Sequence, residues 1–332
     1  MRTIAIFLCL LLFISCNGGK NDRLPASTGQ PYEVVLEGDT DKIISEILTE
    51  DVPGLPQSEP LCNVINVKRG KTQGSYQLVR TRIVVDIDKQ HKGFSAKTTQ
   101  DVNASPQTVI HIKAKSTEQL RVMLYDKNGK ANKNAELLRS IIDKNELKHQ
   151  ASIIQQNPVK QQEVKRMFGL NMKIPASLDA SKKAKGFLWL SNNASSGMQN
   201  LIIFRLKGNG SAESNAWSYS LGEMNKILKL NMPGETNNIY MQLVNQGEDT
   251  ERDENLLHTS RGLWEMKGDA MGGPYLMKVL PMSGGRIMTL HSYHKLPGRI
   301  DFRIVVIGFV YAPEMKKRNL TKQLEAVLNT IK

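Results

Sequence analysis

Hydrophobic positions along the chain predict short strands interleaved with helices. Runs of strand length with apolar character occur at residues 32–36, 61–68, 76–88, 93–100, 108–113, 170–174, 187–190, 201–206, 239–244, 257–267, 275–280, 286–293 and 299–311. Apolar residues spaced three and four apart predict helices near 40–48, 116–124, 133–155, 158–168, 220–230 and 313–331. This mixture, without a regular strand-helix-strand repeat, predicts an α+β fold with mostly antiparallel or mixed sheets.

The helical stretch in the middle of the chain separates two groups of strands. Each group closes with a strand followed by a helix, at 108–125 and 299–331, which suggests a pseudo-repeat. We therefore predict two α/β halves, residues 31–168 and 169–332, joined by a helical middle. The apolar run Ile304–Val310 predicts a central strand that is covered on both faces.

The first residues have the pattern of an export signal. Arg2 precedes an apolar run from Ile4 to Ile14, which is shorter than the roughly 20 residues that span a bilayer. Ser15 stands directly before Cys16, and this arrangement resembles the lipobox of bacterial lipoproteins, with Phe13 in place of the more usual leucine. The resemblance implies removal of residues 1–15 and acylation of Cys16 by palmitate or a similar chain. An ordinary secretory signal with an incidental cysteine is the alternative.

The polar stretch that follows is rich in Gly, Pro and Ser. We expect residues 16–30 to form a flexible tether, with a typical end-to-end distance of roughly 20 Å. Membrane attachment through the lipid on Cys16 then predicts a location in the cell envelope. Because residues 17–23 lack an acidic run, we expect an outer-membrane protein that faces the periplasm, with the cell surface as the alternative.

The net charge limits the partners that the protein can have, and the cysteine content limits the roles of its thiols. The 332-residue chain has a formal charge of +13 and three cysteines, of which Cys9 leaves with the signal and Cys62 lies in an apolar run. We expect Cys62 to be a small buried hydrophobic residue. An exported basic protein does not normally meet nucleic acid, so anionic lipid, glycolipid or an acidic cell-wall polymer is the expected counterpart of the basic clusters. Solvated helix faces are the alternative. These clusters are at 68–71, 165–166, 182–185 and 316–318.

The segment from Arg261 to Tyr275 contains four glycines, one proline, one tryptophan and charges of both signs. One interpretation is a structural turn with Trp264 in the core and Arg261 paired with Glu265 or Asp269. Another places Arg261, Glu265 and Asp269 at one end of a cleft floored by Trp264, where a guanidinium beside aromatic surface suits a carboxylate, phosphate or sugar. A third gives Glu265 and Asp269 acid–base roles on a glycan. The candidate ligand-binding residues are Arg261, Trp264, Glu265, Asp269 and Tyr275.

Several short motifs occur together with this segment, namely Pro53–Pro60, Pro106-Gln107, Tyr311-Ala312-Pro313 and Lys317-Arg318. On these residues the chain resembles an uncharacterised family of lipoproteins from Bacteroidota envelopes, domain of unknown function 4837. The resemblance spans nearly the whole mature chain, is strongest at 261–275 and 308–328, and is weakest at 205–245. It implies an envelope location and no mechanism, because the family has no established activity.

The remaining sequence contains no catalytic motif, metal-ligand cluster or cofactor loop, so we expect neither a metal nor a cofactor. The leading hypothesis is a non-catalytic envelope lipoprotein that binds a ligand or serves envelope maintenance. One alternative is a hydrolase of an envelope glycan, and another is a structural partner of an outer-membrane protein complex.

Overall fold

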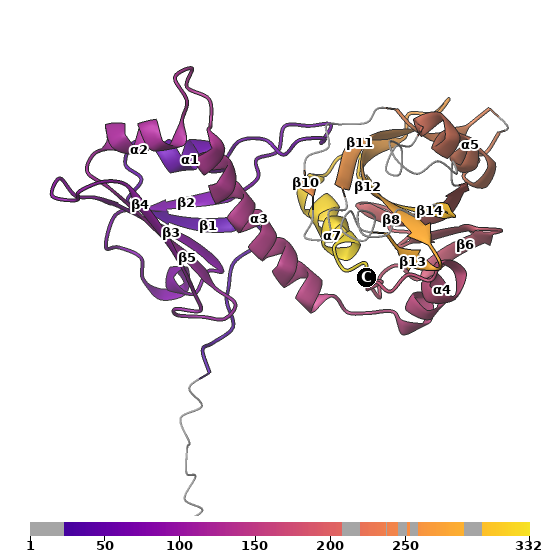
Figure 1. Ribbon diagram of the computed structural model, residues 1–332, viewed down its shortest axis with the longest axis horizontal. Coiled ribbons are helices and arrows are strands. Elements are labelled where there is room, and N and C mark those ends of the chain that lie inside the picture. The colour runs from indigo at the N-terminus through magenta and orange to yellow at the C-terminus, as the bar shows by residue number, and fades with distance from the viewer. Residues whose placement is uncertain (1–22, 208–219, 237, 245–250, 253–257, 289–300) are drawn as a thin grey trace, which may run out of the picture.

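The computed structural model describes residues 23–207, 220–236, 238–244, 251–252, 258–288 and 301–332 (Figure 1). These residues form an α+β protein with one mixed and one antiparallel sheet. The predicted fold class is therefore confirmed. None of the helices in these ranges is long and apolar enough to cross a membrane.

The N-terminal domain is a five-stranded sheet with helices packed on one face (Figure 1). The strands lie in the order β2-β1-β3-β5-β4, and only the edge strand β4 runs antiparallel to its neighbour. They are β1 (Glu33–Glu37), β2 (Asn63–Val67), β3 (Thr81–Ile87), β4 (Ser95–Gln100) and β5 (Thr108–Ala114). A short 3-10 helix, η1 (Gly74–Gln77), precedes β3. The helices are α1 (Ile43–Leu48), α2 (Thr117–Leu124) and α3 (Lys133–Ile153).

Local sequence explains why α1 starts where it does. The Asp39 carboxylate accepts hydrogen bonds from the backbone N–H groups of Ile44 and Ser45, at 3.3 and 2.8 Å, and so satisfies donors that a helix leaves unpaired. The apolar residues of α1 are all buried. Cys62 packs in the same core and is a free thiol, and burial raises its pKa to about 12. It is thus the inert buried residue that the sequence predicts.

The C-terminal domain is built on a nine-stranded antiparallel sheet with the main order β10-β11-β12-β14-β8-β7-β6, counted over the described residues. Two further strands extend it, because β9 pairs with β11 and β13 pairs with β12. The strands are β6 (Ala180–Ala184), β7 (Phe187–Ser191), β8 (Met198–Lys207), β9 (Tyr240–Leu243), β10 (Glu251–Arg252), β11 (His258–Lys267), β12 (Gly272–Ser283), β13 (Arg286–Ile287) and β14 (Phe302–Tyr311). The helices are α4 (Pro158–Phe168), α5 (Leu221–Asn231) and α7 (Arg318–Leu328).

Strand β14 lies inside this sheet, between β12 and β8, and contributes to a core on each face. Ile304 and Val306 pack in the core that α4 and α7 cover, whereas Val305 and Ile307 pack in the core that α5 covers. The prediction of a central strand covered on both faces is confirmed.

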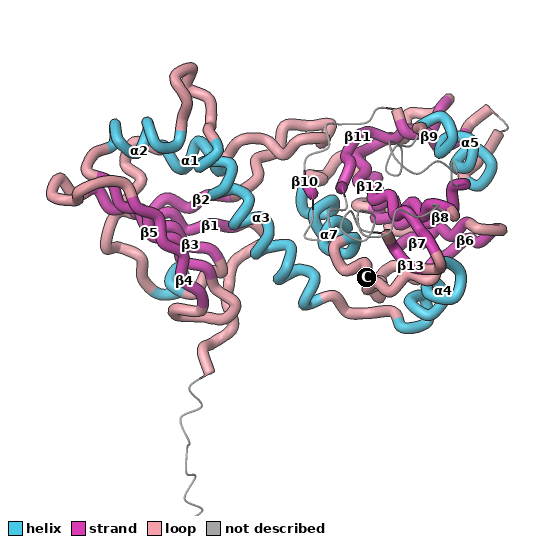
Figure 2. The backbone as a smooth tube through the Cα atoms, in the orientation of Figure 1, coloured by secondary structure: helices cyan, strands magenta, loops and turns pink. Residues whose placement is uncertain are grey.

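The helical middle consists of α3 and α4, which the tube of Figure 2 shows as two successive helices joined by a short loop. Helix α3 packs on the N-terminal sheet and also contacts α7. Helix α4, placed by the sequence at the end of the first half, buries Val164 and Phe168 in the C-terminal core. The two sheets differ in strand order and direction, so the suggested pseudo-repeat does not extend to their topology.

Two expected elements differ from the structure. Residues 170–174 form no strand, because Asn171 exchanges backbone hydrogen bonds with Lys332 and not with a sheet neighbour. Within the expected tether, Ala26 and Thr28 form isolated β-bridges with Ser105 and Val79, so these two residues are attached to the N-terminal domain. The expected strand at 286–293 begins as β13, and its residues from 289 lie outside the described part of the chain.

Candidate binding site between the two domains

A buried ion pair joins α3 to α7. The Lys322 ammonium lies 2.7 Å from Oδ1 and 2.8 Å from Oδ2 of Asp143. The Tyr32 hydroxyl donates a 2.6 Å hydrogen bond to Oδ1 of the same carboxylate. Because all three side chains are largely withdrawn from water, each charge depends on its partner to offset the cost of desolvation.

The ion pair continues into the C-terminal domain. Glu325, one helical turn beyond Lys322, lies with Oε2 3.1 Å from the Lys322 ammonium and pairs through Oε1 with Arg261 of β11. Burial alone would raise the pKa of Glu325, but Lys322 and Arg261 outweigh it and lower the pKa to about 2. Burial likewise opposes the charge of Lys322, yet Glu325 and Asp143 hold its pKa above the usual value. Both groups therefore stay ionised over a wide pH range.

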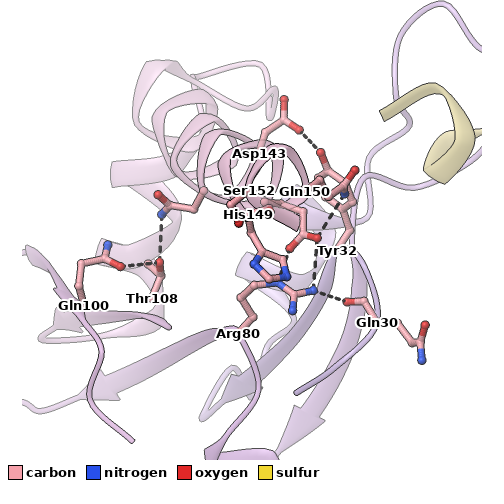
Figure 3. A network of polar contacts seen from close by, with 11 residues as sticks. Gln30, Tyr32, Arg80, Gln100, Thr108, Asp143, His149, Gln150 and Ser152 are labelled. Carbon is pink, nitrogen blue, oxygen red and sulfur yellow. Dashed lines mark hydrogen bonds and ion pairs between the residues drawn. The ribbon is translucent and has the colours of Figure 1, made fainter. Parts of the chain in front are cut away.

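The polar face of α3 extends this network across the N-terminal domain (Figure 3). Glu146, one turn after Asp143, accepts hydrogen bonds from Arg80 at 2.8 and 3.3 Å and from Gln150 at 3.2 Å. Arg80 also donates to the Gln30 carbonyl at 3.3 Å. These contacts attach α3 to the chain segment that leads into β1, and so fix the helix that carries Asp143.

The proline-rich segment between α1 and β2 makes a second connection. Glu59 accepts hydrogen bonds from the backbone N–H groups of Lys317 and Arg318, at 2.7 and 3.0 Å, at the start of α7. A carboxylate at a helix N-terminus satisfies free donors and interacts favourably with the helix dipole. Arg318 in turn donates to the Pro60 carbonyl at 2.6 Å. The basic cluster predicted at 316–318 therefore has Lys317 and Arg318 buried in this interface.

A cleft of about 660 Å³ lies beside the buried ion pairs. Asp143, Arg261 and Lys322 lie at its buried end, Arg139 and Lys133 come from the exposed side of α3, and Val52, Pro53 and Leu61 form an apolar wall. Both domains thus contribute to one concave surface, and boundaries of this kind are a common place for ligands. Arg139 pairs with Glu50, so opposite charges balance most of the cations here.

The five residues predicted from the 261–275 segment do not form a single cluster. Arg261 lies opposite Leu276, which belongs to the core under α7, and reaches the cleft. Trp264 belongs to the core on the other face, where its indole N–H donates to the Val310 carbonyl at 3.1 Å. Tyr275 is buried in that same core. The structure therefore separates Arg261 from the tryptophan that was expected to floor its cleft.

The two carboxylates of the segment have separate partners. Glu265 in β11 accepts a 2.6 Å hydrogen bond from Gln242 of β9. Asp269 is exposed in the following turn and accepts a 2.6 Å hydrogen bond from the Ala270 N–H. Neither residue lines the interdomain cleft. Among the five candidates, Arg261 alone lines it.

Comparison with family models assigns both domains. Residues 157–330, more than half of the chain, match the model of Domain of unknown function (DUF4837), so the chain belongs to this family. Residues 27–155 match a second model, Domain of unknown function (DUF8532). The match to the first family thus covers α4 and the C-terminal domain. It is shorter than the resemblance implies, which spans nearly the whole mature chain. Searches of curated proteins and of solved structures found no match.

Proposed function

We propose that this protein is a lipoprotein of a bacterial cell envelope, of the Bacteroidota type that the sequence resembles, which binds an envelope component without chemical conversion. Lipid on Cys16 anchors it, in an outer membrane and facing the periplasm. The ligand or partner binds in the interdomain cleft.

The main support for a lipid anchor is the position of Cys16, directly after a small residue at the end of an apolar run. A single acyl chain gives only marginal membrane binding, but the multiple chains of a lipidated cysteine hold a protein stably. The chain is fixed to the N-terminal domain from Ala26 onward. About ten residues then separate lipid from domain, a span on the order of 17 Å for a flexible chain. The body would therefore stay close to the membrane surface.

The electrostatics of the cleft support binding over acid–base chemistry. A general acid or base works best with a pKa near the operating pH. Lys322 lines the cleft and its pKa is raised, and Glu325, buried behind Lys322, has a pKa lowered to about 2, so neither group exchanges protons readily near neutral pH. Fixed charges of this kind are suited to holding domains and ligands in position.

Fractionation of cells that express a Cys16→Ser variant tests the anchor. We expect the native protein in the membrane fraction and the variant either unprocessed or released by a salt wash. Ser15→Ala, which keeps both the cysteine and a small residue before it, is the matched control for an altered signal region. Membrane retention of the Cys16→Ser protein with its signal removed would contradict lipid anchoring.

A further inference from the structure

A second concave surface lies on the C-terminal domain, away from the interdomain cleft. It has a volume of about 600 Å³ and is formed by three segments, one from α4, one at 170–173 and one at the end of the chain. Its side chains are Pro158, Gln161, Gln162, Lys165, Leu170, Asn171, Met172, Lys173, Asn329, Thr330 and Lys332.

Hydrogen bonds between these segments hold the pocket in shape. Asn171 and Lys332 exchange backbone hydrogen bonds of 3.4 and 2.8 Å. The Lys173 N–H donates to the Thr330 hydroxyl at 2.9 Å, and the Gln161 side chain donates to the Met172 carbonyl at 3.2 Å. The three walls are therefore fixed relative to one another before any ligand arrives, which lowers the entropy cost of binding.

The charge of this pocket is unbalanced. Lys165, Lys173 and Lys332 supply three ammonium groups, and none of the described residues that line the pocket has a carboxylate side chain. The Lys173 ammonium donates one 2.7 Å hydrogen bond to the Ala151 carbonyl and has two further N–H donors. In the interdomain cleft, by contrast, the buried cations Arg261 and Lys322 face carboxylates.

The remaining lining groups are suited to a polar, hydroxylated molecule. Gln161, Gln162, Asn171 and Asn329 each bring a carboxamide, which can donate to and accept from hydroxyl groups. Leu170 is fully buried beneath the pocket, and Pro158 adds apolar surface at its edge. A lysine ammonium is a compact point charge that suits a phosphate group.

We propose that this pocket binds a phosphate group carried by a small hydroxylated moiety. Two sources have this chemistry, the headgroup of an anionic phospholipid and a soluble phosphorylated compound. In Figure 1 the described chain starts at the lower edge of the N-terminal domain, and α4 lies along the lower edge of the C-terminal domain. The lipid source rests on the proposed anchor at Cys16, which would bring the protein to a membrane, whereas the soluble source does not.

The first experiment uses the purified full chain in a neutral detergent. Calorimetric titration with glycerol 3-phosphate, inorganic phosphate and glycerol measures the binding of soluble ligands, which is the soluble arm of the test. The pocket variant is Lys165→Gln with Lys332→Gln, which changes two exposed lining residues. The control variant, Lys127→Gln with Lys130→Gln, removes the same charge from an exposed turn of the N-terminal domain.

The second experiment releases the same proteins from nanodiscs of phosphatidylcholine with phosphatidylglycerol and counts retained lipid by native mass spectrometry. Saturable binding of glycerol 3-phosphate but not glycerol, weakened at least tenfold in the pocket variant only, supports a soluble ligand. Retained phosphatidylglycerol that disappears in the pocket variant only supports a lipid headgroup.

Absence of binding in both arms would overturn the proposal, as would equal binding by the pocket and control variants. The soluble arm does not depend on the lipid anchor, so its failure is distinguishable from failure of the proposed function. A circular dichroism spectrum that matches the native protein shows that the pocket variant is folded.

Discussion

The ammonium group of Lys322 lies within 2.8 Å of both carboxylate oxygens of Asp143, although 179 residues separate the two along the chain. The pair joins α7 of the C-terminal domain to α3 on the N-terminal sheet. Both residues are more than nine-tenths buried. A buried pair of this kind stabilises little relative to apolar residues, but loss of one member leaves an uncompensated charge. The interface between the domains should therefore be sensitive to single substitutions.

Replacement of Lys322 by Met should lower the free energy of unfolding by about 3–5 kcal/mol, because Asp143 and Glu325 would remain buried without their shared cation. Urea denaturation followed by circular dichroism measures the change. Lys144→Met, at an exposed position of α3, is the control and should change stability by less than about 0.5 kcal/mol. Equal effects of the two substitutions would show that the pair is not important for stability.

The coupling between Lys322 and Asp143 can be measured apart from the loss of either residue. A double-mutant cycle with Lys322→Met and Asp143→Asn should give an interaction energy of about 1–3 kcal/mol, as expected for residues in direct contact. Additive effects of the two substitutions would contradict the contact.

Protonation of Glu325 in acid should lower the free energy of unfolding. Its pKa is about 2 in the folded protein against an ordinary value of 4.5. A lowered folded pKa contributes stability above pH 4.5 and loses it as the pH falls from 4.5 toward 2, because the unfolded state then binds the proton more tightly. The free energy of unfolding, measured across this range, should decrease less steeply for Glu325→Gln than for the native protein. Parallel curves would exclude Glu325 as a source of the acid sensitivity.

Glu59 should stabilise α7 from outside its own domain. Substitution by Ala removes two hydrogen bonds at the helix N-terminus and should cost about 1–2 kcal/mol. The segment 53–60 should also become more susceptible to limited proteolysis, because Glu59 attaches it to α7. Glu314→Ala removes an exposed carboxylate shortly before the helix and is the matched control. A variant with native stability and native cleavage would show that the cap is dispensable.

The glycines of the 261–275 segment have a packing role that a substitution can test. A Cβ atom on Gly273 would lie 2.1 Å from the Val310 carbonyl oxygen and 3.2 Å from the Trp264 indole nitrogen. Gly273→Ala should therefore destabilise the protein by at least about 1–3 kcal/mol, as overpacking does. Gly93→Ala, where a Cβ meets no atom within 4 Å, should be close to neutral. A soluble Gly273→Ala protein with native melting temperature would argue against this close approach of β12 to Val310 and Trp264.

Hydrophobic periodicity predicted most of the elements, because each of them buries one apolar face or stripe. It predicted α7 from Leu324 and its apolar neighbours, and β14 from a continuous apolar run. Strand β6 was missed, since its sequence ASKKA is polar and its residues lie at the exposed edge of the sheet. The expected strand at 170–174 has the right composition, but its backbone partner is the end of the chain.

The interdomain site could be predicted only in part. Arg261 was identified from its dense local motif, but its partner Glu325 lies 64 residues away on another element. The residues near Arg261 in the sequence do not reveal that Glu325 lies beside it in the folded protein. The sequence did contain one indication of this site, because Lys322 and Glu325 are charged residues beside the apolar face of the last helix. Charged residues there indicate either a wider solvent face or a buried pair, and only tertiary structure distinguishes these.

We propose that Cys16 carries lipid and holds this two-domain body at a membrane. Mass spectrometry of the N-terminal peptide, from protein purified out of native membranes, tests it most directly. We predict a peptide that begins at Cys16 with a mass increase equal to a diacylglyceryl group, with or without a third acyl chain. A peptide that begins at another residue, or at an unmodified Cys16, would contradict the account.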